Sequence, residues 1–400
     1  MLKPKVLFIV WWYPTDRSPV DAVFVEDQAK ALSDSFDVLV LHFSFVNYRM
    51  LMFNRSPMRV VRENRAGVNI LRYPILLVPR MQTISLYRRA TQKAFRHVVG
   101  FWGRPDIIHA HVTYPPGWIA MRLGKQNKIP VVLTEHSGPF SALFSSRAAT
   151  HLIGETLTNV DSVVAVSPSL AAEMHERYPS LQIQVIGNIV PADFFAAAAA
   201  GSLDRRPADL SLFSAALLTR DKGFDYLIRA AKLLVERGIN NFRILVGGDG
   251  PYRKTLEELV ADLGIGSHFQ FLGMLSRPQV RVQMQKCDVF ILPSLHETFS
   301  MVVAEAMACG KPVIATRCGG PEYYVDKECG ILVNTKDAAA LAGAMADFIE
   351  GRIHFEPSRI RSRIDGRFGG AAFVKNISEL YDPLLSSSIG GKLPESDARD

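Results

Sequence analysis

The stretch LHETFSMVVAEAMACGKP, residues 295–312, decides how the whole sequence is interpreted. Two glutamates, Glu297 and Glu305, stand eight positions apart, with a polar turn between them and an apolar run after the turn. The run predicts a buried helix that begins near Ser300, which is a favourable N-cap residue. Because the first N–H groups of a helix have no intrahelical partner, the N-terminus of this helix suits an anion such as a diphosphate.

Each glutamate has a functional and an ordinary interpretation. A carboxylate accepts two hydroxyl hydrogen bonds at once, so Glu305 suits the diol of a ribose and Glu297 suits the hydroxyls of a sugar beside the phosphates. The ordinary interpretation makes Glu305 a partner of the helix dipole and Glu297 a solvated loop residue. Two carboxylates at this spacing are weak evidence alone, so the rest of the chain has to decide.

The strand-and-helix pattern around this stretch repeats along the chain. Short β-branched runs alternate with helical patterns, which predicts parallel sheets with crossover helices. The expected strands are residues 6–10, 36–41, 69–72, 106–109, 130–134, 162–166 and 182–186, then 212–217, 243–247, 269–272, 289–292, 312–315 and 331–333. The expected helices include 24–32, 85–99, 224–237, 252–263, 278–286, 301–308, 338–349 and 368–384. We therefore expect two doubly wound α/β domains that bind ligands at the carboxyl ends of their strands.

The length of 400 residues is too great for one ordinary hydrophobic core and suits two domains. The expected division is a first domain at 1–195, a linker at 196–211 that contains five consecutive alanines, and a second domain at 212–366. A final helix at 367–384 and a disordered tail at 385–400, rich in Ser, Gly and Asp, complete the chain.

Cysteine usage and the N-terminus indicate the cellular compartment. Cys287, Cys309, Cys318 and Cys329 form no Cys-x-x-Cys pair, which suits reduced core thiols in the cytoplasm. The apolar run near the N-terminus lacks a small-residue cleavage site, so we interpret residues 6–10 as a strand and not as part of a signal peptide. No stretch reaches the roughly 18 apolar residues of a membrane span.

Positive charge is concentrated between residues 45 and 100, where Glu63 is the only acid. The basic residues there are Arg49, Arg55, Arg59, Arg62, Arg65, Arg72, Arg80, Arg88, Arg89, Lys93 and Arg96, and the interleaved residues include Tyr48, Tyr87 and the apolar strip 50–53. Such a segment attracts phosphate groups, and the apolar strip favours an anionic membrane surface over nucleic acid. A solvated, soluble face is the ordinary alternative.

Two further motifs follow strands of the second half. Lys222 lies at a strand-to-helix turn, where a lysine can reach phosphate, and Thr219 and Arg220 are possible further donors. An exposed lysine on a turn is the ordinary alternative. The glycine-rich turn at 247–250, which contains Gly248, permits either a close approach to a ligand or a tight turn. It is not a G-x-G-x-x-G sequence, which favours the plain turn.

Three histidines stand at strand ends in the first half. His136 is the best placed for contact with a sugar hydroxyl or a developing charge, whereas His109 and His111 lie on one face of an extended segment and are equally compatible with packing. Three converging histidines can in principle bind a metal, but no Asp-x-Asp pair accompanies them. We therefore expect no metal site.

Together these segments resemble the retaining glycosyltransferases of family 4, which have the GT-B fold. The resemblance runs from VLFIVWWYP to about Tyr381, and its most specific element is E-x7-E, here Glu297 and Glu305, followed by EAMACGKPVIAT and GGPE. KGFDYLI, GGDGP, FLGML and VSPSL occur in the order and spacing of the family. The resemblance implies two Rossmann-like domains that face each other across a cleft. The second holds a sugar nucleotide, the first holds the acceptor, and the final helix crosses back to the first.

The resemblance also implies roles for individual residues. Lys222 would neutralise the diphosphate, Glu305 would hold the ribose, Glu297 would contact the donor sugar, and His136 would lie beside the anomeric carbon. The implied catalytic residues are His136, Lys222 and Glu297. The implied donor-binding residues are Lys222, Arg220, Gly248, Met274, Leu275, Glu297, Phe299, Ser300, Met301 and Glu305, with Gly319 and Gly320 as backbone contacts. Backbone N–H groups of residues 299–301 would bind the distal phosphate, and the loop 273–275 would meet the base.

Three positions depart from the family pattern. Leu217 stands where an arginine that binds phosphate usually precedes the lysine, Ser300 where glycine is common, and Ala22 where related sequences have a loop glycine. Both carboxylates and Lys222 remain. We therefore expect an active, retaining, metal-independent hexosyltransferase without a cofactor. It would use a UDP or GDP sugar and a saccharide acceptor, lipid-linked, in cell-surface polysaccharide or glycolipid synthesis, on the inner face of the membrane.

Two alternatives stay open. A GT-B sugar-nucleotide epimerase would need carboxylates in the first domain for proton abstraction at carbon two, and the sequence shows no such set. A catalytically impaired relative that serves as a membrane-binding module gains weight from the leucine at position 217.

Overall fold

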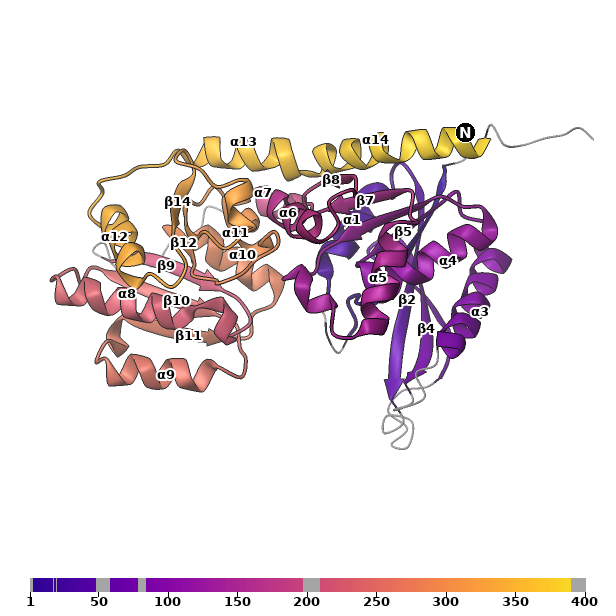
Figure 1. Ribbon diagram of the computed structural model, residues 1–400. Coiled ribbons are helices and arrows are strands. Elements are labelled where there is room, and N and C mark those ends of the chain that lie inside the picture. The colour runs from indigo at the N-terminus through magenta and orange to yellow at the C-terminus, as the bar shows by residue number, and fades with distance from the viewer. Residues whose placement is uncertain are drawn as a thin grey trace, which may run out of the picture. The chain divides into compact units, whose positions relative to one another are not determined.

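The computed structural model describes residues 3–16, 18, 20–47, 58–77, 84–196 and 209–389. These residues divide into two compact units. Figure 1 colours the chain from indigo at the N-terminus to yellow at the C-terminus. Unit 1 holds the chain up to Val166, the segment Glu173–Ile186 and the chain from Phe373 onward. Unit 2 holds Ser167–Ala172 and Gly187–Ala372.

Unit 1 is built on a sheet that has eight strands among the described residues, in the order β3-β4-β2-β1-β5-β6-β7-β8. The strands are β1 (Lys5–Val10), β2 (Asp37–Asn47), β3 (Val61–Arg65), β4 (Val68–Leu77), β5 (Ile107–His111), β6 (Val131–Glu135), β7 (Ser162–Ala165) and β8 (Ile183–Val185). Neighbours are parallel except β3 and β4. The central strands β5 and β6 are buried at every position, as expected of a parallel sheet covered on both faces.

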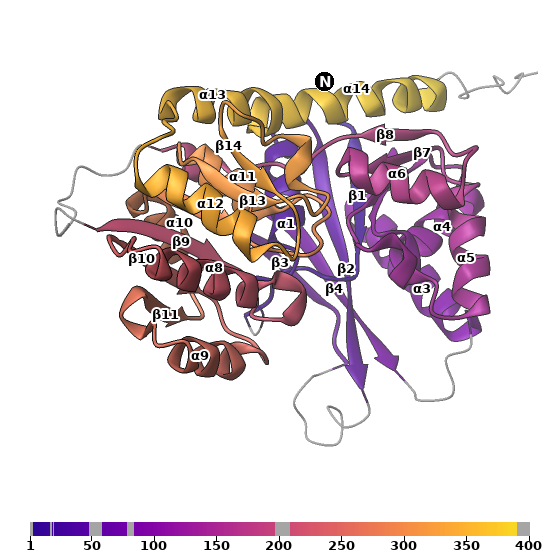
Figure 2. The same ribbon diagram turned by 60° about the vertical axis from the view of Figure 1, so that its left-hand side comes forward.

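The helices of unit 1 are α1 (Val23–Leu32), α3 (Ile84–Trp102), α4 (Trp118–Asn127), α5 (Arg147–Leu157) and part of α6 (Pro168–Arg177). Helices α3, α4 and α5 pack side by side (Figures 1 and 2). Short helical turns, η1 (Thr113–Gly117) and η2 (Phe140–Leu143), follow β5 and β6. The carboxyl ends of β1, β5 and β6 therefore feed loops that lie on one edge of the sheet.

The edge of this sheet differs from the sequence-based expectation. Strand β3 was not predicted, because its sequence VRENR has no alternating apolar pattern and it lies mostly exposed at the sheet edge. It forms a hairpin with β4 through a two-residue turn, Ala66-Gly67, in which both residues have positive φ. Strands β2 and β4 are longer than predicted, because they pair with each other as far as Asn47 and Leu77.

Unit 2 contains an all-parallel sheet with six strands in the described part, in the order β11-β10-β9-β12-β13-β14. The strands are β9 (Leu210–Ala215), β10 (Phe242–Gly247), β11 (Phe269–Gly273), β12 (Val289–Leu292), β13 (Val313–Thr316) and β14 (Gly330–Val333). Its longer helices are α8 (Phe224–Glu236), α9 (Arg253–Asp262), α10 (Arg277–Lys286), α11 (Met301–Ala308), α12 (Ala338–Ile349) and α13 (Pro357–Phe368). These bounds lie close to the predicted ranges, except for α13.

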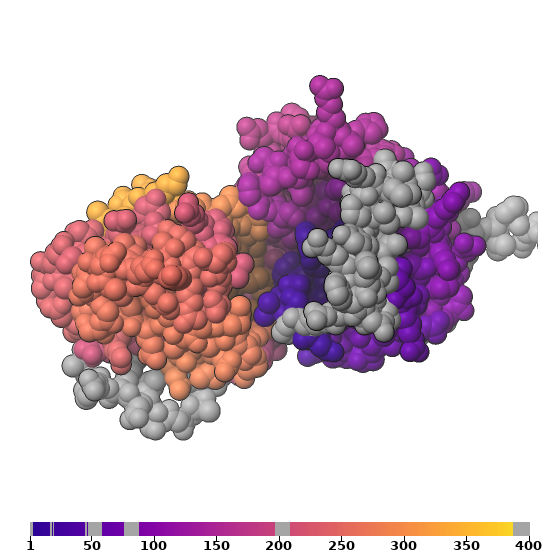
Figure 3. Space-filling model, turned by 90° about the horizontal axis from the view of Figure 1, so that it is seen from below, coloured from indigo at the N-terminus to yellow at the C-terminus, as the bar shows by residue number. Residues whose placement is uncertain are grey.

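Alternate residues of the unit 2 strands pack on opposite faces. Leu212, Ile244 and Ile291 join one core with α8, α9 and α12, whereas α10 and α11 pack together and α11 packs against α13. Helix α9 lies at the lower edge of unit 2 in Figure 1, and the salmon and orange part of the chain that contains it faces the viewer in Figure 3. The mixed α/β architecture, in which each unit has a Rossmann-like sheet of mainly parallel strands, confirms the prediction.

The C-terminal helices correct one prediction and confirm another. Helix α13 was not predicted, although Ile360, Ile364 and Phe368 recur every four residues and are all buried. Helix α14 (Gly370–Ile389) continues past the predicted end at 384, and residues 390–400 of the predicted tail lie outside the described residues. From Phe373 onward α14 belongs to unit 1, so the predicted return to the first domain is confirmed.

Among the described residues, every helix is too short or too polar to cross a bilayer. The four cysteines are buried and free.

Candidate active site

Two loops at the carboxyl edge of the unit 2 sheet bring Lys222 and Glu297 together. Lys222 ends the short turn η3 (Arg220–Lys222) after β9, and Glu297 lies in the loop between β12 and α11. Lys222 Nζ lies 3.0 Å from Glu297 Oε1, which also accepts a hydrogen bond from Ser294 Oγ at 2.8 Å. The two loops pack so closely that a Cβ on Gly223 would lie 2.1 Å from the Pro293 carbonyl oxygen. Glycine at 223 is therefore required to place the lysine.

The surroundings of Lys222 favour its charged form. Burial by itself would lower the pKa of Lys222, but the Glu297 and Asp221 carboxylates together outweigh this effect and the pKa of the ammonium is raised. The Lys222 side chain is 22% exposed and the Glu297 side chain 16%, so solvent or a ligand can reach both. A cation that is anchored and accessible can neutralise an anionic ligand.

The loop that carries Glu297 also shapes the start of α11. Gly320 N–H donates to the Glu297 carbonyl at 2.8 Å, and a Cβ on Gly320 would lie 2.5 Å from the Phe299 carbonyl carbon. Ser300, the N-cap of α11, is in the left-handed region with φ 66°, which a residue other than glycine seldom adopts. Its hydroxyl oxygen is buried and has no hydrogen-bond partner in the described structure. Strained backbone and an unsatisfied hydroxyl at a helix N-terminus are features of ligand sites.

Glu305 lies in an environment that the sequence did not predict. Its carboxylate is buried, with 7% of the side chain exposed, and Oε1 accepts from Arg277 Nη2 at 2.8 Å and from Nε at 3.2 Å. Arg277 opens α10, and its guanidinium lies 5.4 Å from the centroid of the Phe194 ring. The sequence carries no signal for this ion pair, because the two residues are 28 positions apart on different helices.

The other predicted donor-binding residues are distributed around the same sheet edge. Gly248 has φ 123°, and a Cβ there would lie 1.9 Å from the Ala216 carbonyl oxygen, so the close approach it permits is to this chain's own backbone. Arg220 is exposed, with its guanidinium 5.5 Å from the Tyr252 ring centroid. Met274 is 60% exposed, and Leu275 lies against Gly247.

In unit 1 the three predicted histidines form a stack. Ring centroids of His109 and His111 are 4.6 Å apart, and those of His111 and His136 are 5.3 Å apart. His109 is a core residue with both ring nitrogens bonded, to Tyr381 Oη at 2.6 Å and Thr134 Oγ1 at 2.7 Å. Burial lowers the pKa of His109 to about 3, and it lowers the pKa of His111 well below the usual value. His136 is the outermost of the three and is half-buried.

Glu135, which builds the loop that carries His136, was not predicted from the sequence. Glu135 is fully buried and accepts hydrogen bonds from the backbone N–H groups of Thr113 at 2.8 Å, His136 at 2.8 Å and Ser137 at 2.7 Å. Its position at the end of a predicted strand was the available signal. Within the same motif, TEHSG, His136 was selected as the candidate and Glu135 was not considered.

The structure uses part of the basic segment in contacts within the fold. Arg65 pairs with Glu26 at 2.6 Å, and Arg72 pairs with Glu63 and donates to His42 Nδ1 and the Pro14 carbonyl. Arg62 stacks on Phe101, with its guanidinium carbon 3.9 Å from the ring centroid. Arg59 and the α3 residues Arg88, Arg89, Lys93 and Arg96 are described, whereas Tyr48, Arg49, the strip 50–53, Arg55 and Arg80 lie outside the described residues.

Among the described residues, no three His, Cys, Asp or Glu side chains converge in a way that could hold a metal ion.

Two family models match the chain over most of its length. Residues 202–363 match the model of glycosyl transferases group 1, and residues 22–194 match that of glycosyltransferase family 4. With the GT-B architecture of its two units, the chain belongs to the family 4 glycosyltransferases.

The chain is similar to several known proteins. The uncharacterized glycosyltransferase MJ1178 of Methanocaldococcus jannaschii is 29% identical over 245 residues, which span 61% of this chain and 65% of that relative. The putative teichuronic acid biosynthesis glycosyltransferase TuaC of Bacillus subtilis is 26% identical over 406 residues, covering 96% of this chain and all of the relative. The structure of Anabaena HepE in complex with UDP shares the fold, with a TM-score of 0.74, 18% identity and coverage of 95% of this chain and 100% of that chain.

Proposed function

We propose that the protein transfers a hexosyl unit, with retention of anomeric configuration, from a nucleotide-diphosphate sugar to a saccharide acceptor. The observation that carries the proposal is the accessible Lys222–Glu297 pair in the loops that lead to the N-terminus of α11. An ammonium and unpaired helix amides are the two groups that stabilise a departing diphosphate without a metal ion.

Each group has a part in the reaction. The bond from the anomeric carbon to the diphosphate oxygen breaks, and its electron pair stays on that oxygen, where Lys222 and the first amides of α11 stabilise the charge. The acceptor oxygen forms the new bond on the face that the diphosphate leaves, and its proton passes to the leaving phosphate oxygen. Glu297 positions Lys222 and the donor sugar, Glu305 binds the ribose, and His136 stabilises the charge that develops at the anomeric carbon.

The other donor-binding roles proposed for unit 2 follow its loops. Residues 299–301 hold the distal phosphate, Met274 and Leu275 contact the base, and Arg220 and Gly248 border the diphosphate. The donors considered are UDP and GDP sugars, and the HepE complex with UDP supports the first. The division into an acceptor domain at 1–195 and a donor domain at 212–366 is part of the proposal.

The acceptor is proposed to be lipid-linked, which places the protein at the cytoplasmic face of a membrane in polysaccharide or glycolipid synthesis. The name of the TuaC relative supports a polysaccharide product. Helix α3 supports the membrane, because Arg88, Arg89, Lys93 and Arg96 are all exposed and the helix sequence ISLYRRATQKAFRHVVGFW contains no acid. Changing Arg88, Arg89 and Lys93 to Glu should abolish sedimentation with anionic vesicles, and unchanged sedimentation would contradict this assignment.

A donor screen tests the proposed function. Thermal-shift measurements against UDP, GDP, ADP and their sugar conjugates should show stabilisation by one nucleotide, because a ligand that binds only the folded state raises apparent stability. With that donor and added acceptor, NMR of the product should show the donor's own anomeric configuration, and EDTA should not reduce the rate. An inverted product or a metal requirement would contradict the proposal.

A further inference from the structure

The turn before α11 is held from behind by one tyrosine. Tyr324 Oη lies 2.7 Å from the carbonyl oxygen of Phe299 and 2.7 Å from that of Ser300. Tyr324 is 1% exposed, and its ring packs against Phe299 and Phe368, with centroids 5.3 and 5.5 Å away. Burial raises the pKa of the Tyr324 hydroxyl well above its ordinary value, so the group keeps its one proton and shares it between the two carbonyl oxygens.

Anchoring these two carbonyls sets the direction of two amides. In a trans peptide the C=O and the following N–H point in opposite directions. With the carbonyls of Phe299 and Ser300 turned toward Tyr324, the N–H groups of Ser300 and Met301 point away from it. Met301 opens α11, so its N–H is one of the amides without an intrahelical partner.

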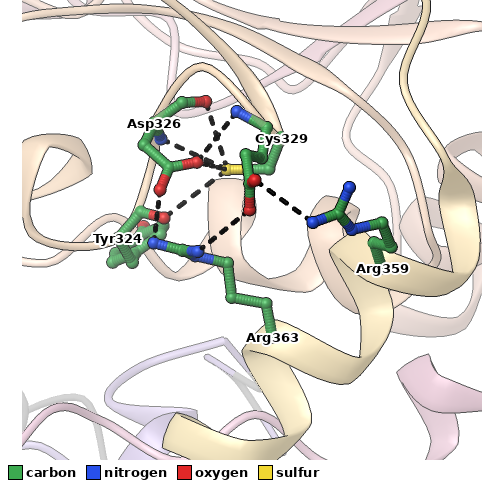
Figure 4. A network of polar contacts seen from close by, with 6 residues as sticks. Tyr324, Asp326, Cys329, Arg359 and Arg363 are labelled. Atoms are coloured by element: carbon green, nitrogen blue, oxygen red, sulfur yellow. Dashed lines mark hydrogen bonds and ion pairs between the residues drawn. The ribbon is translucent and has the colours of Figure 1, made fainter.

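The tyrosine is itself held in place by α13. Figure 4 shows the turn 324–329 with Cys329 Sγ close to the Tyr324 carbonyl and to Asp326, and with Arg363 and Arg359 reaching it from α13. Arg363 pairs with Asp326, and Arg359 Nη2 lies 3.1 Å from Glu328 Oε1. The chain of contacts therefore runs from α13 through this turn and Tyr324 to the backbone at 299–300.

The backbone at Ser300 requires such support. Its left-handed φ of 66° is costly for a residue with a Cβ, and strained conformations persist only where surrounding contacts enforce them. The Tyr324 hydroxyl contacts the carbonyl on each side of the Ser300 Cα. A phenylalanine at 324 would keep the ring packing and remove only these two hydrogen bonds.

We propose that Tyr324 is a positioning residue for donor binding, which aims the Ser300 and Met301 amides at the donor's diphosphate and is braced for this task by the contacts of α13. The inference rests on the proposed function, because it assigns the diphosphate to the N-terminus of α11. Tyr324 itself touches no substrate.

The test compares nucleotide affinity in three single variants. Calorimetry with UDP and GDP identifies the nucleotide that the parent protein binds, and the dissociation constant is then measured for Tyr324→Phe, Tyr323→Phe and Lys222→Ala. Tyr323→Phe is the matched control, because it loses a hydroxyl one residue away while its ring stays on Phe368, 5.5 Å from centroid to centroid. We expect Tyr324→Phe to raise the dissociation constant about tenfold and the donor KM likewise, with the acceptor KM unchanged. Tyr323→Phe should match the parent.

The possible outcomes separate this inference from the proposed function. If the parent binds neither nucleotide, the proposed function fails and the inference fails with it. If Lys222→Ala weakens binding but Tyr324→Phe lowers only the melting temperature, the inference alone is wrong. If Tyr324→Phe does not fold, Arg363→Gln is measured instead. The Arg363 side chain is 35% exposed, and its substitution removes only the contacts of this side chain with the turn 324–329. A several-fold weaker nucleotide affinity in Arg363→Gln supports the inference, and an unchanged affinity overturns it.

Discussion

Each unit places a carboxylate at the carboxyl edge of its parallel sheet, and the two carboxylates are held in different ways. In unit 1, Glu135 is fully buried and accepts from three backbone N–H groups. In unit 2, Glu297 is 16% exposed and bonds to two side chains, the Lys222 ammonium and the Ser294 hydroxyl.

The difference separates an anchor from an exchangeable site. Backbone amides cannot turn away from Glu135 without unfolding the loop, so its hydrogen bonds fix that loop permanently. The Lys222 ammonium sits on a flexible side chain and can share its hydrogen bonds between Glu297 and an incoming anion. Glu135 therefore builds structure, while the Lys222–Glu297 pair is available for chemistry.

The largest expected effect falls on the exchangeable side of this comparison. Lys222→Ala should lower donor turnover by a hundredfold or more, because it removes the charge that we propose stabilises the leaving diphosphate, on the order of 3 kcal/mol. Steady-state kinetics with the donor found in the nucleotide screen measures this. Lys232→Ala is the control, since Lys232 lies on α8 in a surface pair 3.6 Å from Glu236. Equal turnover in parent and Lys222→Ala would rule out the assigned role.

Substitution of Glu135, the anchor of unit 1, should change the stability of the fold and not donor turnover. Glu135→Gln puts an NH₂ group where a backbone N–H needs an acceptor, so the free energy of unfolding of unit 1 should fall by about 3 kcal/mol. All four tryptophans lie in unit 1, so their fluorescence in urea reports this unit alone. Nucleotide affinity, which we assign to unit 2 in the proposed function, should not change.

Glu155→Gln provides the matched control for the anchor. Glu155 accepts a side-chain hydrogen bond from Trp118 Nε1 at 3.3 Å. Glu155→Gln should therefore lower the free energy of unfolding by less than about 1 kcal/mol. If both substitutions cost the same, Glu135 is not the anchor described here.

Unit 1 should also lose stability in acid because of its buried histidines. Burial and the neighbouring Arg72 lower the pKa of His42 to about 4, and burial lowers the pKa of His109 to about 3. Between pH 6.5 and 4 the unfolded chain protonates these imidazoles and the folded chain does not. As the pH is lowered through this window, the free energy of unfolding should therefore decrease, by up to about 1.4 kcal/mol per pH unit for each histidine.

The same tryptophan signal in urea, measured from pH 7 to pH 4.5, checks this prediction. His42→Asn should flatten the slope, because the amide side chain of asparagine does not take up a proton in this range. His97→Gln, at an exposed position of α3, is the control for the loss of a histidine that is not buried. A slope that is the same in all three proteins would contradict the assignment to the buried histidines.

The comparison also explains which parts of the site could be predicted from the sequence. The carboxyl ends of strands can be located from β-branched runs, and for this reason the loops that carry Lys222 and Glu297 and the start of α11 at Met301 were predicted. Local patterns also placed most helices of unit 2 within one or two residues. These predictions depend on contacts between residues that are near in sequence or on strand periodicity alone.

What could not be predicted depends on long-range contacts between side chains. The pair Arg277–Glu305 joins two helices, Tyr324 reaches back 24 and 25 residues, and neither is marked by any local pattern. Strand β3 was missed because an exposed edge strand needs no apolar alternation. The division of the basic segment into paired and exposed arginines likewise depends on which acids the fold brings near.

The smallest expected effect adds a second exchangeable cation to unit 2. Leu217 is 56% exposed on a turn fixed by hydrogen bonds from Ala216 N to Gly247 O at 3.2 Å and from Leu218 N to Asp249 O at 2.9 Å. The family resemblance places an arginine at this position. Leu217→Arg should tighten nucleotide binding about threefold to tenfold, a gain that shrinks as salt screens the charge. Leu217→Gln has a similar shape without the charge, so an equal gain in that variant would show that the turn, and not the cation, limits affinity.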